Sequence, residues 1–423
     1  MSSRRKFIKN SSTGLVGAAL VPTALVGQHN IPDILVVRSA VEKGEWGIIR
    51  DLFPLSHQRA YLNTGTMGPM SQKVLNTLNE WNSKVAITGE YGGYEPALER
   101  IAEFVGANKD EIAITHNTTE GINIVAQGIS LKKGDEVILT DNEHVGGALP
   151  WLARAQRDGI VLRTFTPART TEQNLELISD LITPRTRVIA VPHILCTTGI
   201  RLPIKEIADL AKERGLISVI DGAHGPGSMD LDLEELGVHV YAACCHKWLC
   251  GPGGTGFIYV NEEVQERIEP VFVGAMSDLG WQLDVSDQRI TGWNPTAHRY
   301  FYGTQSASLA QGVISAMDLM ADIGVGLIEQ RVLHLSNYLT QALLQADLPI
   351  ELLSAEEDAS RSGMVGFRLN NVDHQQVFQK AMKNSFRIRM VPESGLDSLR
   401  VSTHIYNSES ELDGFVAFLK GLE

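Results

Sequence analysis

The sequence predicts an α/β protein with a mostly parallel sheet covered by helices on both faces, followed by a smaller α+β part. Short, continuous apolar and β-branched runs alternate with helix-like segments up to about residue 305. Such runs are typical of strands that are buried on both faces of a sheet. Beyond that point a long helix-like stretch precedes a region of sparse strands, which favours a separate small lobe.

The expected elements are taken here from the N-terminus onward. Residues 31–60 show no clear periodicity and are expected to form an irregular arm. Apolar runs bounded by polar or turn residues predict strands, at residues 111–115, 136–140, 187–191, 216–221 and 256–260. A helix is expected from Thr119. Further on we expect a long helix at residues 306–346 and a strand at residues 363–369.

The N-terminal residues predict a targeting segment. Four bases and no acid precede a short apolar stretch rich in Gly and Ala, at residues 14–27. This pattern is typical of a secretory signal and is too short for a stable membrane anchor. The adjacent Arg4 and Arg5, in Ser-Arg-Arg-Lys-Phe-Ile-Lys, resemble a twin-arginine signal. We therefore expect export to the periplasm through the Tat translocase. An ordinary basic N-terminus on a cytoplasmic protein is the alternative.

Composition excludes some classes of partner. The formal net charge of −13 argues against nucleic-acid binding, which needs a basic face. The chain has no run of eighteen apolar residues, so no membrane span is required. The four cysteines, Cys196, Cys244, Cys245 and Cys250, have no metal-binding spacing, so we expect free buried thiols and no metal site.

Asp221 and Lys247 carry the most specific chemical signal. Asp221 ends an expected strand, and ligands of open α/β sheets bind at the carboxyl ends of strands. A buried acid there needs a cationic partner, and a pyridinium N–H would supply one. Lys247 follows among apolar residues, whose burial would favour the free amine that imine formation requires. The pair indicates pyridoxal phosphate (PLP), held by Lys247 as a Schiff base.

Two motifs carry a family resemblance. Asp-Gly-Ala-His at residues 221–224 and His-Lys-Trp-Leu-Cys-Gly-Pro at residues 246–252 resemble the class V aminotransferase family. The isopenicillin N epimerase-like branch is the most similar, and the resemblance covers about residues 60 to 420. It implies a fold type I PLP enzyme whose large domain has a seven-stranded type of sheet, with a small C-terminal domain, in a homodimer. The expected boundaries are 1–27 for the signal, 28–60 for the arm, 61–305 for the large domain and 306–423 for the small one.

The same resemblance, together with local chemistry, predicts the cofactor site. Thr118 and Thr119 link a strand to a helix, where free N–H groups and hydroxyls would face the cofactor phosphate, although a simple helix cap also explains them. The family places a residue such as His144 on the pyridine ring, and an ordinary lone histidine is the alternative. By resemblance, His246 contacts the phosphate and His224 lies near the phenolic oxygen.

Three further residues are assigned to substrate and subunit contacts. Thr304 matches a Gly-Thr segment that reaches a neighbouring subunit's phosphate in the family. Arg400 matches the arginine that binds the substrate carboxylate through a bidentate contact, and a structural ion pair is the alternative. Asn63, where the arm ends, is placed with Arg400 at the substrate site.

Three sequence features narrow the prediction. Gly251–Gly256 fits the pattern G-x-G-x-x-G but leads into a strand, so we reject dinucleotide binding. Residues 387–400 contain no cysteine, which disfavours desulfuration by a nucleophilic thiol. Where relatives have an Asn beside the cofactor's phenolic oxygen, this chain has Cys196 or a neighbour, so another donor is needed there.

These features predict an enzyme that forms an α-carbanion from an amino acid, with Lys247 as general base. Transamination is preferred, and epimerisation and C–S or β-lyase chemistry are the alternatives. Signal and family together also resemble a periplasmic PLP enzyme that modifies a peptide siderophore. A PLP-binding protein without catalysis is the alternative of another class, although a scaffold would not need Arg400.

Overall fold

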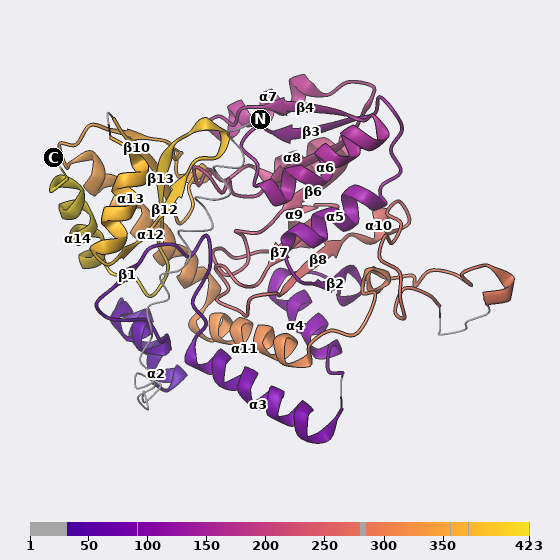
Figure 1. Cartoon of the computed structure of the whole chain (residues 1–423), viewed down its shortest axis with the longest axis horizontal. Helices are drawn as coiled ribbons and strands as arrows, with labels where there is room; N and C mark the ends of the chain where they lie inside the picture. The colour runs from indigo at the N-terminus through magenta and orange to yellow at the C-terminus, as the bar shows by residue number, and fades with distance from the viewer. Residues whose placement is uncertain (1–31, 91, 280–284, 356, 371, 423) are drawn as a thin grey trace, which may run out of the picture.

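The computed structural model describes residues 32–90, 92–279, 285–355, 357–370 and 372–422. The expected signal at residues 1–27 therefore lies outside the described residues, and export stays a prediction. Figure 1 shows a large sheet with its helices on one side of the molecule and a smaller sheet, near the C-terminus, on the other.

The large sheet has seven strands in the order β2-β8-β7-β6-β5-β3-β4. Strands β3 to β7 pair in parallel, whereas β8 runs antiparallel to both of its neighbours. The strands are β2 (Ile112–Thr115), β3 (Glu136–Thr140), β4 (Val161–Phe165), β5 (Thr186–Pro192), β6 (Ile217–Asp221), β7 (Val240–Cys244) and β8 (Gly256–Val260). The mostly parallel sheet predicted from the sequence is confirmed.

Both faces of this sheet are covered, which explains why its strands have no polar face. In β6, Val219 packs in one apolar cluster and Ile220 in the other. Helices α5 and α6 cover the first face, and α4, α7 and α8 contribute to the second. The helices of this part are α3 (Gln72–Thr88), α4 (Glu95–Val105), α5 (Thr118–Gly128), α6 (Val145–Asp158), α7 (Thr171–Leu181), α8 (Ile204–Glu213), α9 (Leu233–Leu236) and α10 (Glu262–Gln265).

The C-terminal part contains a four-stranded antiparallel sheet in the order β12-β13-β10-β9. Its strands are β9 (Ile350–Leu352), β10 (Met364–Leu369), β12 (Arg389–Val391) and β13 (Ser398–Ser402), with helices α13 (His374–Lys383) and α14 (Glu409–Lys420). A third apolar cluster lies between this sheet and its helices. The short strand β1 (Ala60–Tyr61) pairs in parallel with β11 (Phe386–Arg387), so the arm enters beside this C-terminal part.

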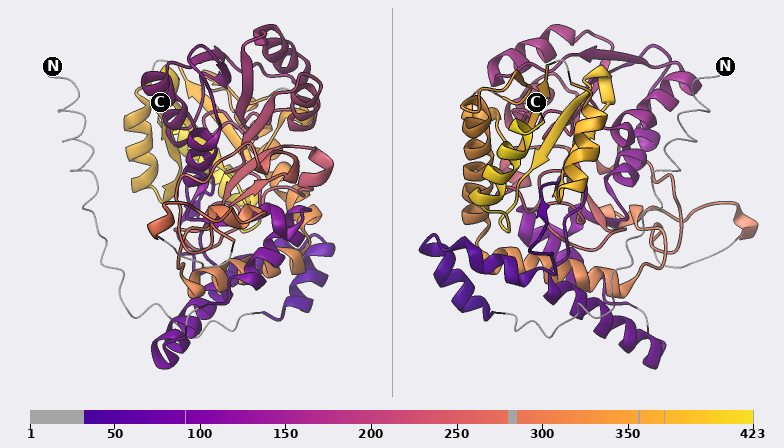
Figure 2. Two further views of the ribbon diagram at one scale, coloured as in Figure 1. Left: turned by 90° about the vertical axis from the view of Figure 1, so that its right-hand side faces the viewer. Right: turned by 60° about the vertical axis from the view of Figure 1, so that its left-hand side comes forward.

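The single long helix expected at residues 306–346 is wrong. Two helices, α11 (Ala307–Ile323) and α12 (Val325–Leu344), meet at a bend of 79°. Gly324 lies at the bend with φ of +105°, a backbone conformation that favours glycine. As a result α11 packs along α3, as Figures 1 and 2 show, while α12 packs on α14. Among the described residues no single helix could span a membrane, although this bent pair meets the length and composition criteria together.

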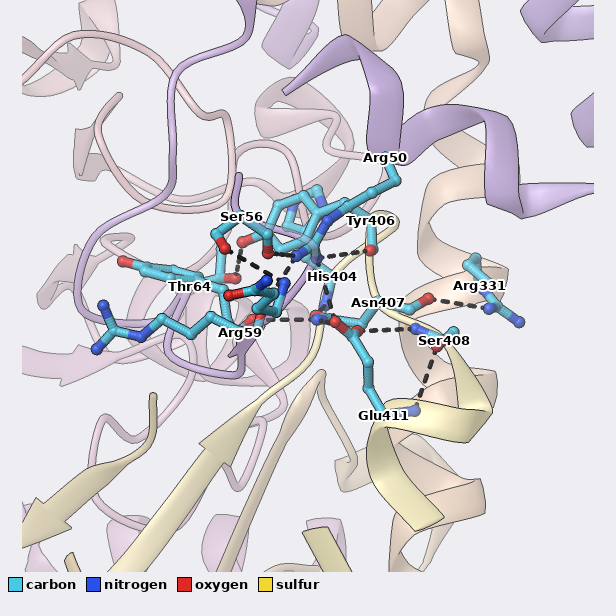
Figure 3. A network of polar contacts seen from close by, with 12 residues as sticks. Arg50, Ser56, Arg59, Thr64, Arg331, His404, Tyr406, Asn407, Ser408 and Glu411 are labelled. Atoms are coloured by element: carbon cyan, nitrogen blue, oxygen red, sulfur yellow. Dashed lines mark hydrogen bonds and ion pairs between the residues drawn. The ribbon is translucent and has the colours of Figure 1, made fainter. Parts of the chain in front are cut away.

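The arm is also more ordered than the sequence suggested. It contains α2 (Ile34–Glu42) and the 3-10 helix η2 (Trp46–Leu52) instead of irregular chain. Arg50 links the arm to the C-terminal part, since its guanidinium donates to Glu411 at 3.2 Å and to the Tyr406 carbonyl at 3.4 Å (Figure 3). Periodicity did not reveal this helix because its exposed residues include the apolar Leu35 and Val36, which weaken the contrast between a buried apolar face and an exposed polar one.

Candidate active site

Asp221 and Lys247 lie at the same edge of the large sheet. Asp221 ends β6, and the parallel neighbour β7 ends three residues before Lys247. The carboxyl ends of neighbouring parallel strands meet at one edge, which is where α/β proteins bind ligands. Asp221 is buried, and its Oδ1 accepts the Ala223 N–H at 3.0 Å, which leaves Oδ2 for another partner.

Three histidines surround Lys247 and are held neutral. Burial is the largest cause that lowers the pKa of each ring, and the charge of Lys247 lowers it further. His144 caps α6 by accepting the Gly146 N–H at 3.0 Å, and His224 Nε2 lies 3.4 Å from Lys247 Nζ. His246 is partly buried beside the lysine. The three predicted histidines are thus brought together around one amine.

The residues expected to hold the phosphate fit such a group. The hydroxyl of Thr118 and Nδ1 of His246 are buried without a hydrogen-bond partner of ordinary geometry among the described residues. Thr118 is the first residue of α5, where backbone N–H groups are unpaired and favour an anion. The side chain of Thr119 points to the start of α6, because a Cβ built on Gly146 would lie 2.1 Å from its hydroxyl. The alternative that Thr118 or Thr119 merely caps the helix is wrong, since the cap of α5 is Asn117, whose Oδ1 accepts the Glu120 N–H at 2.9 Å.

Thr304 is not among these residues by any contact that the structure describes. It is exposed in the segment that precedes α11. Its expected role toward a neighbouring subunit stays a prediction.

Arg400 is a buried cation with only neutral partners. Its side chain is 1% exposed and donates to the Cys196 carbonyl, to Asn63 Oδ1 at 3.4 Å and to Thr66 Oγ1 at 3.1 Å. Its Nε has no partner among the described residues. Burial, followed by the charge of Arg389, lowers the pKa of Arg400 to about 9. A carboxylate ligand would relieve this arrangement, which supports the predicted substrate contact over a structural ion pair.

Sequence reasoning missed Glu143, Arg389 and Thr66. Glu143 follows β3 at the same sheet edge, and its Oε1 accepts from the Thr140 hydroxyl at 2.9 Å. Desolvation, followed by the charge of Asp221, raises the pKa of Glu143 to about 8. Its place at a strand end, directly before His144, was the signal that could have found it. For Arg389 and Thr66 no local signal exists.

At the Cys196 segment, where relatives have an Asn side chain, the contact that the structure describes is made by the backbone carbonyl of Cys196. The Cys196 carbonyl accepts from Arg389 at 3.2 Å as well as from Arg400, so it orients two guanidinium groups. Burial is the largest cause that raises the pKa of the Cys196 thiol. All four cysteines are free and buried, as predicted. Among the described residues no cluster of His, Cys, Asp or Glu could hold a metal ion.

Comparisons with known proteins find a family model and several curated relatives that match most of this chain. Residues 76–415 match the family model described as "Aminotransferase class-V". The chain is 28% identical over 405 residues to isopenicillin N epimerase of Amycolatopsis lactamdurans, covering 89% of this chain and 98% of that protein. It is also 28% identical to a probable cysteine desulfurase of Halalkalibacterium halodurans, with 89% and 96% covered.

Solved structures show the same fold. A mutant of C-DES with glycine covalently linked to its PLP cofactor has a TM-score of 0.80 and 27% identity, covering 88% of this chain and 98% of that one. The cystine C–S lyase C-DES with its product cysteine persulfide has a TM-score of 0.80 and 26% identity, covering 87% and 98%. The predicted fold type I architecture and pyridoxal 5'-phosphate as cofactor are thereby confirmed.

Proposed function

Since the chain belongs to the class V aminotransferase family, we propose that it removes the α-proton of an amino acid or amino-acid-like substrate, with Lys247 as the base. The buried Arg400, whose partners are all neutral, is the observation that carries this proposal. A carboxylate that binds such a buried guanidinium offsets much of the free-energy cost of its desolvation. The substrate therefore bears a carboxylate next to its amine.

The other residues have distinct tasks in this proposal. Pyridoxal phosphate, when bound, supplies an electron-poor ring that stabilises negative charge on the substrate's α-carbon. Asp221 holds a proton on the ring nitrogen, and Thr118, Thr119 and His246 bind the phosphate. His144 packs against the ring, and Asn63 orients Arg400 through the 3.4 Å contact.

Three outcomes can follow removal of this proton. Transamination is the outcome we prefer, although no residue type selects it, whereas epimerisation and C–S lysis are the activities named for similar proteins. All three share the same first step, so the products distinguish them, not the residue types. A carboxylate-bearing amine that exchanges its α-proton is the common requirement.

The decisive experiment follows this proton. The purified holoenzyme is incubated in D₂O with single L-amino acids and with small peptides that carry a free α-amine, and loss of the α-proton signal is followed by NMR. A keto acid indicates transamination, loss of chirality indicates epimerisation, and release of a β-substituent indicates lyase chemistry. If no candidate exchanges, and none alters the cofactor's absorbance, the non-catalytic alternative is correct.

We further propose that the enzyme works in the periplasm as a homodimer. The adjacent Arg4 and Arg5 support export by the twin-arginine route, and this route carries folded proteins, so the cofactor would be bound before transport. The exposed Thr304 supports a contact with the phosphate site of a second copy. In that compartment a peptide substrate, such as a siderophore, is a candidate.

A further inference from the structure

Trp248, the residue after Lys247, is fully buried, and both its indole N–H and its backbone carbonyl form hydrogen bonds. Its indole N–H donates to His224 Nδ1 at 3.0 Å, and its carbonyl oxygen lies 2.7 Å from His404 Nε2. The Trp248 and His404 rings also stack, with centroids 5.8 Å apart at 26°. His404, labelled in Figure 3, stacks in turn on Tyr406 at 5.2 Å. The indole is therefore held in one orientation toward His224.

This orientation decides where the proton of His224 resides. An indole N–H can only donate, so Nδ1 of His224 must present its lone pair. Burial is the largest cause that keeps the pKa of His224 well below its usual value, so the ring is neutral and carries one proton. That proton is consequently on Nε2, the nitrogen that lies 3.4 Å from Lys247 Nζ.

We propose that Trp248 is a positioning residue that locks His224 as the Nε2–H tautomer, so that the nitrogen of Lys247 always faces a hydrogen-bond donor. A donor facing this nitrogen favours its unprotonated form, because an ammonium group cannot accept a hydrogen bond. This inference deepens the proposed function, since a base must be unprotonated before it can take the α-proton.

Other charged groups around these two side chains point the same way. Arg389 and Arg400 each disfavour a positive charge on His224. The titratable groups that interact with Lys247 are His144, Cys196, His224, Cys244 and His246. Of these side chains, His224 is the one hydrogen-bonded to Nζ. The tautomer of His224 is therefore the property through which Trp248 can act on the lysine.

The tautomer can be measured directly on the wild-type holoenzyme. Histidine labelled with ¹⁵N in both ring nitrogens is observed by long-range ¹H–¹⁵N NMR at pH 7.5, and the His224 signals are assigned from their loss in His224→Gln. We expect a protonated Nε2 and an unprotonated Nδ1. A protonated Nδ1 in the wild-type protein would overturn the proposal, and this measurement requires no variant of Trp248 to fold.

The effect on the lysine is measured by pH titration of the cofactor's visible absorbance. Trp248→Phe keeps an aromatic ring but removes the N–H, so His224 can turn its Nε2 lone pair toward a protonated lysine nitrogen. This titration reports protonation of the Lys247 nitrogen in its Schiff base with the cofactor. In Trp248→Phe its midpoint should rise by about one pH unit, a tenfold change in the protonation equilibrium, as expected for one hydrogen bond to a charged group. An unchanged midpoint contradicts the proposal.

A double-mutant cycle separates the tautomer from packing. In His224→Gln the side-chain amide can donate to the lysine without help from Trp248, so adding Trp248→Phe should cause no further shift. An equal shift in both backgrounds would mean that Trp248 acts through packing, and the proposal fails. The NMR result is independent of turnover. If the tautomer of His224 is locked but the protein exchanges no α-proton of any substrate, the proposed function is refuted and the inference about Trp248 stands.

Discussion

Replacing Arg400 with methionine should stabilise the protein and abolish its recognition of a carboxylate. Methionine has a similar length and no charge, so it fills the site without an unpaired cation. The fall of the pKa of Arg400 from the ordinary arginine value to about 9 corresponds to roughly 5 kcal/mol, an upper limit on what the buried cation costs the folded state. Because a base with a lowered pKa binds fewer protons when folded, this cost is fully present below about pH 9 and disappears toward pH 12.5.

The lost hydrogen bonds offset part of this gain. The guanidinium donates to three oxygens, and each bond is worth about 1 kcal/mol. Two of these acceptors keep another donor, since Arg389 still reaches the Cys196 carbonyl and the Thr66 hydroxyl still reaches Asn63 at 2.9 Å. The balance leaves a stabilisation of at most about 2 kcal/mol at pH 7.5.

Urea unfolding of the holoenzyme measures the expected gain in stability. Arg38→Met, on the exposed face of α2, is the matched control. The control should change the free energy of unfolding by less than about 0.5 kcal/mol. For Arg400→Met, kcat/KM toward a carboxylate-bearing amine should fall roughly thirty- to several-thousand-fold, which corresponds to a loss of about 2–5 kcal/mol of binding free energy. The cofactor's absorbance without substrate should not change.

The reasoning predicts that Arg400→Met is more stable than the wild-type protein and less active toward a carboxylate-bearing amine. A variant that is less stable by several kcal/mol, or that loses its cofactor, would show that Arg400 supports the fold. Equal wild-type activity toward an amine with and without its carboxylate would refute the substrate contact.

Three further predictions use simpler readouts. Lys247→Ala should abolish borohydride-reducible attachment of the cofactor, and mass spectrometry that finds an adduct on another lysine would contradict the assignment. In the cofactor-free protein, folded Glu143 keeps its proton up to about pH 8 whereas an unfolded carboxyl loses it near 4.5, so stability should fall as the pH rises between these values. Glu143→Gln should reduce that slope, by at most about 1.4 kcal/mol per pH unit, and identical pH profiles of thermal unfolding would disprove it. Replacing both Arg4 and Arg5 with lysine should trap a cofactor-loaded precursor in the cytoplasm, and fractionation that still finds mature protein in the periplasm would show that these arginines are incidental.

Local patterns predicted the sheet where the strands carry strongly apolar runs. Residues 136–140 and 256–260 form β3 and β8 with the expected bounds. Strands β4 and β7 were missed for different physical reasons. β4 is an edge strand with an exposed Val161 and little apolar periodicity, and two of the five residues of β7 are alanines, which have weak strand preference.

The candidate site was predictable where its residues follow strands. Asp221 and Lys247 are close in sequence, and the parallel order of β6 and β7 brings them to one edge. Asn63 was expected beside Arg400, whereas the contacts of Arg400 with the Cys196 carbonyl and the Thr66 hydroxyl were not predictable, because these residues are distant from it in sequence. The bend at Gly324 was missed because a single glycine is tolerated inside a helical pattern.

The contacts of the arm with the chain's far end also set an order of assembly. The residues assigned to the cofactor, apart from Thr304, lie between residues 118 and 247, whereas Asn63 and Arg400 are 337 residues apart. Joining such distant segments requires closure of a very long loop, so it follows the formation of nearer contacts. During synthesis the cofactor cradle can therefore form while the C-terminal part is still unmade. We expect the pocket for the carboxylate to be completed last, when Arg50 contacts Glu411.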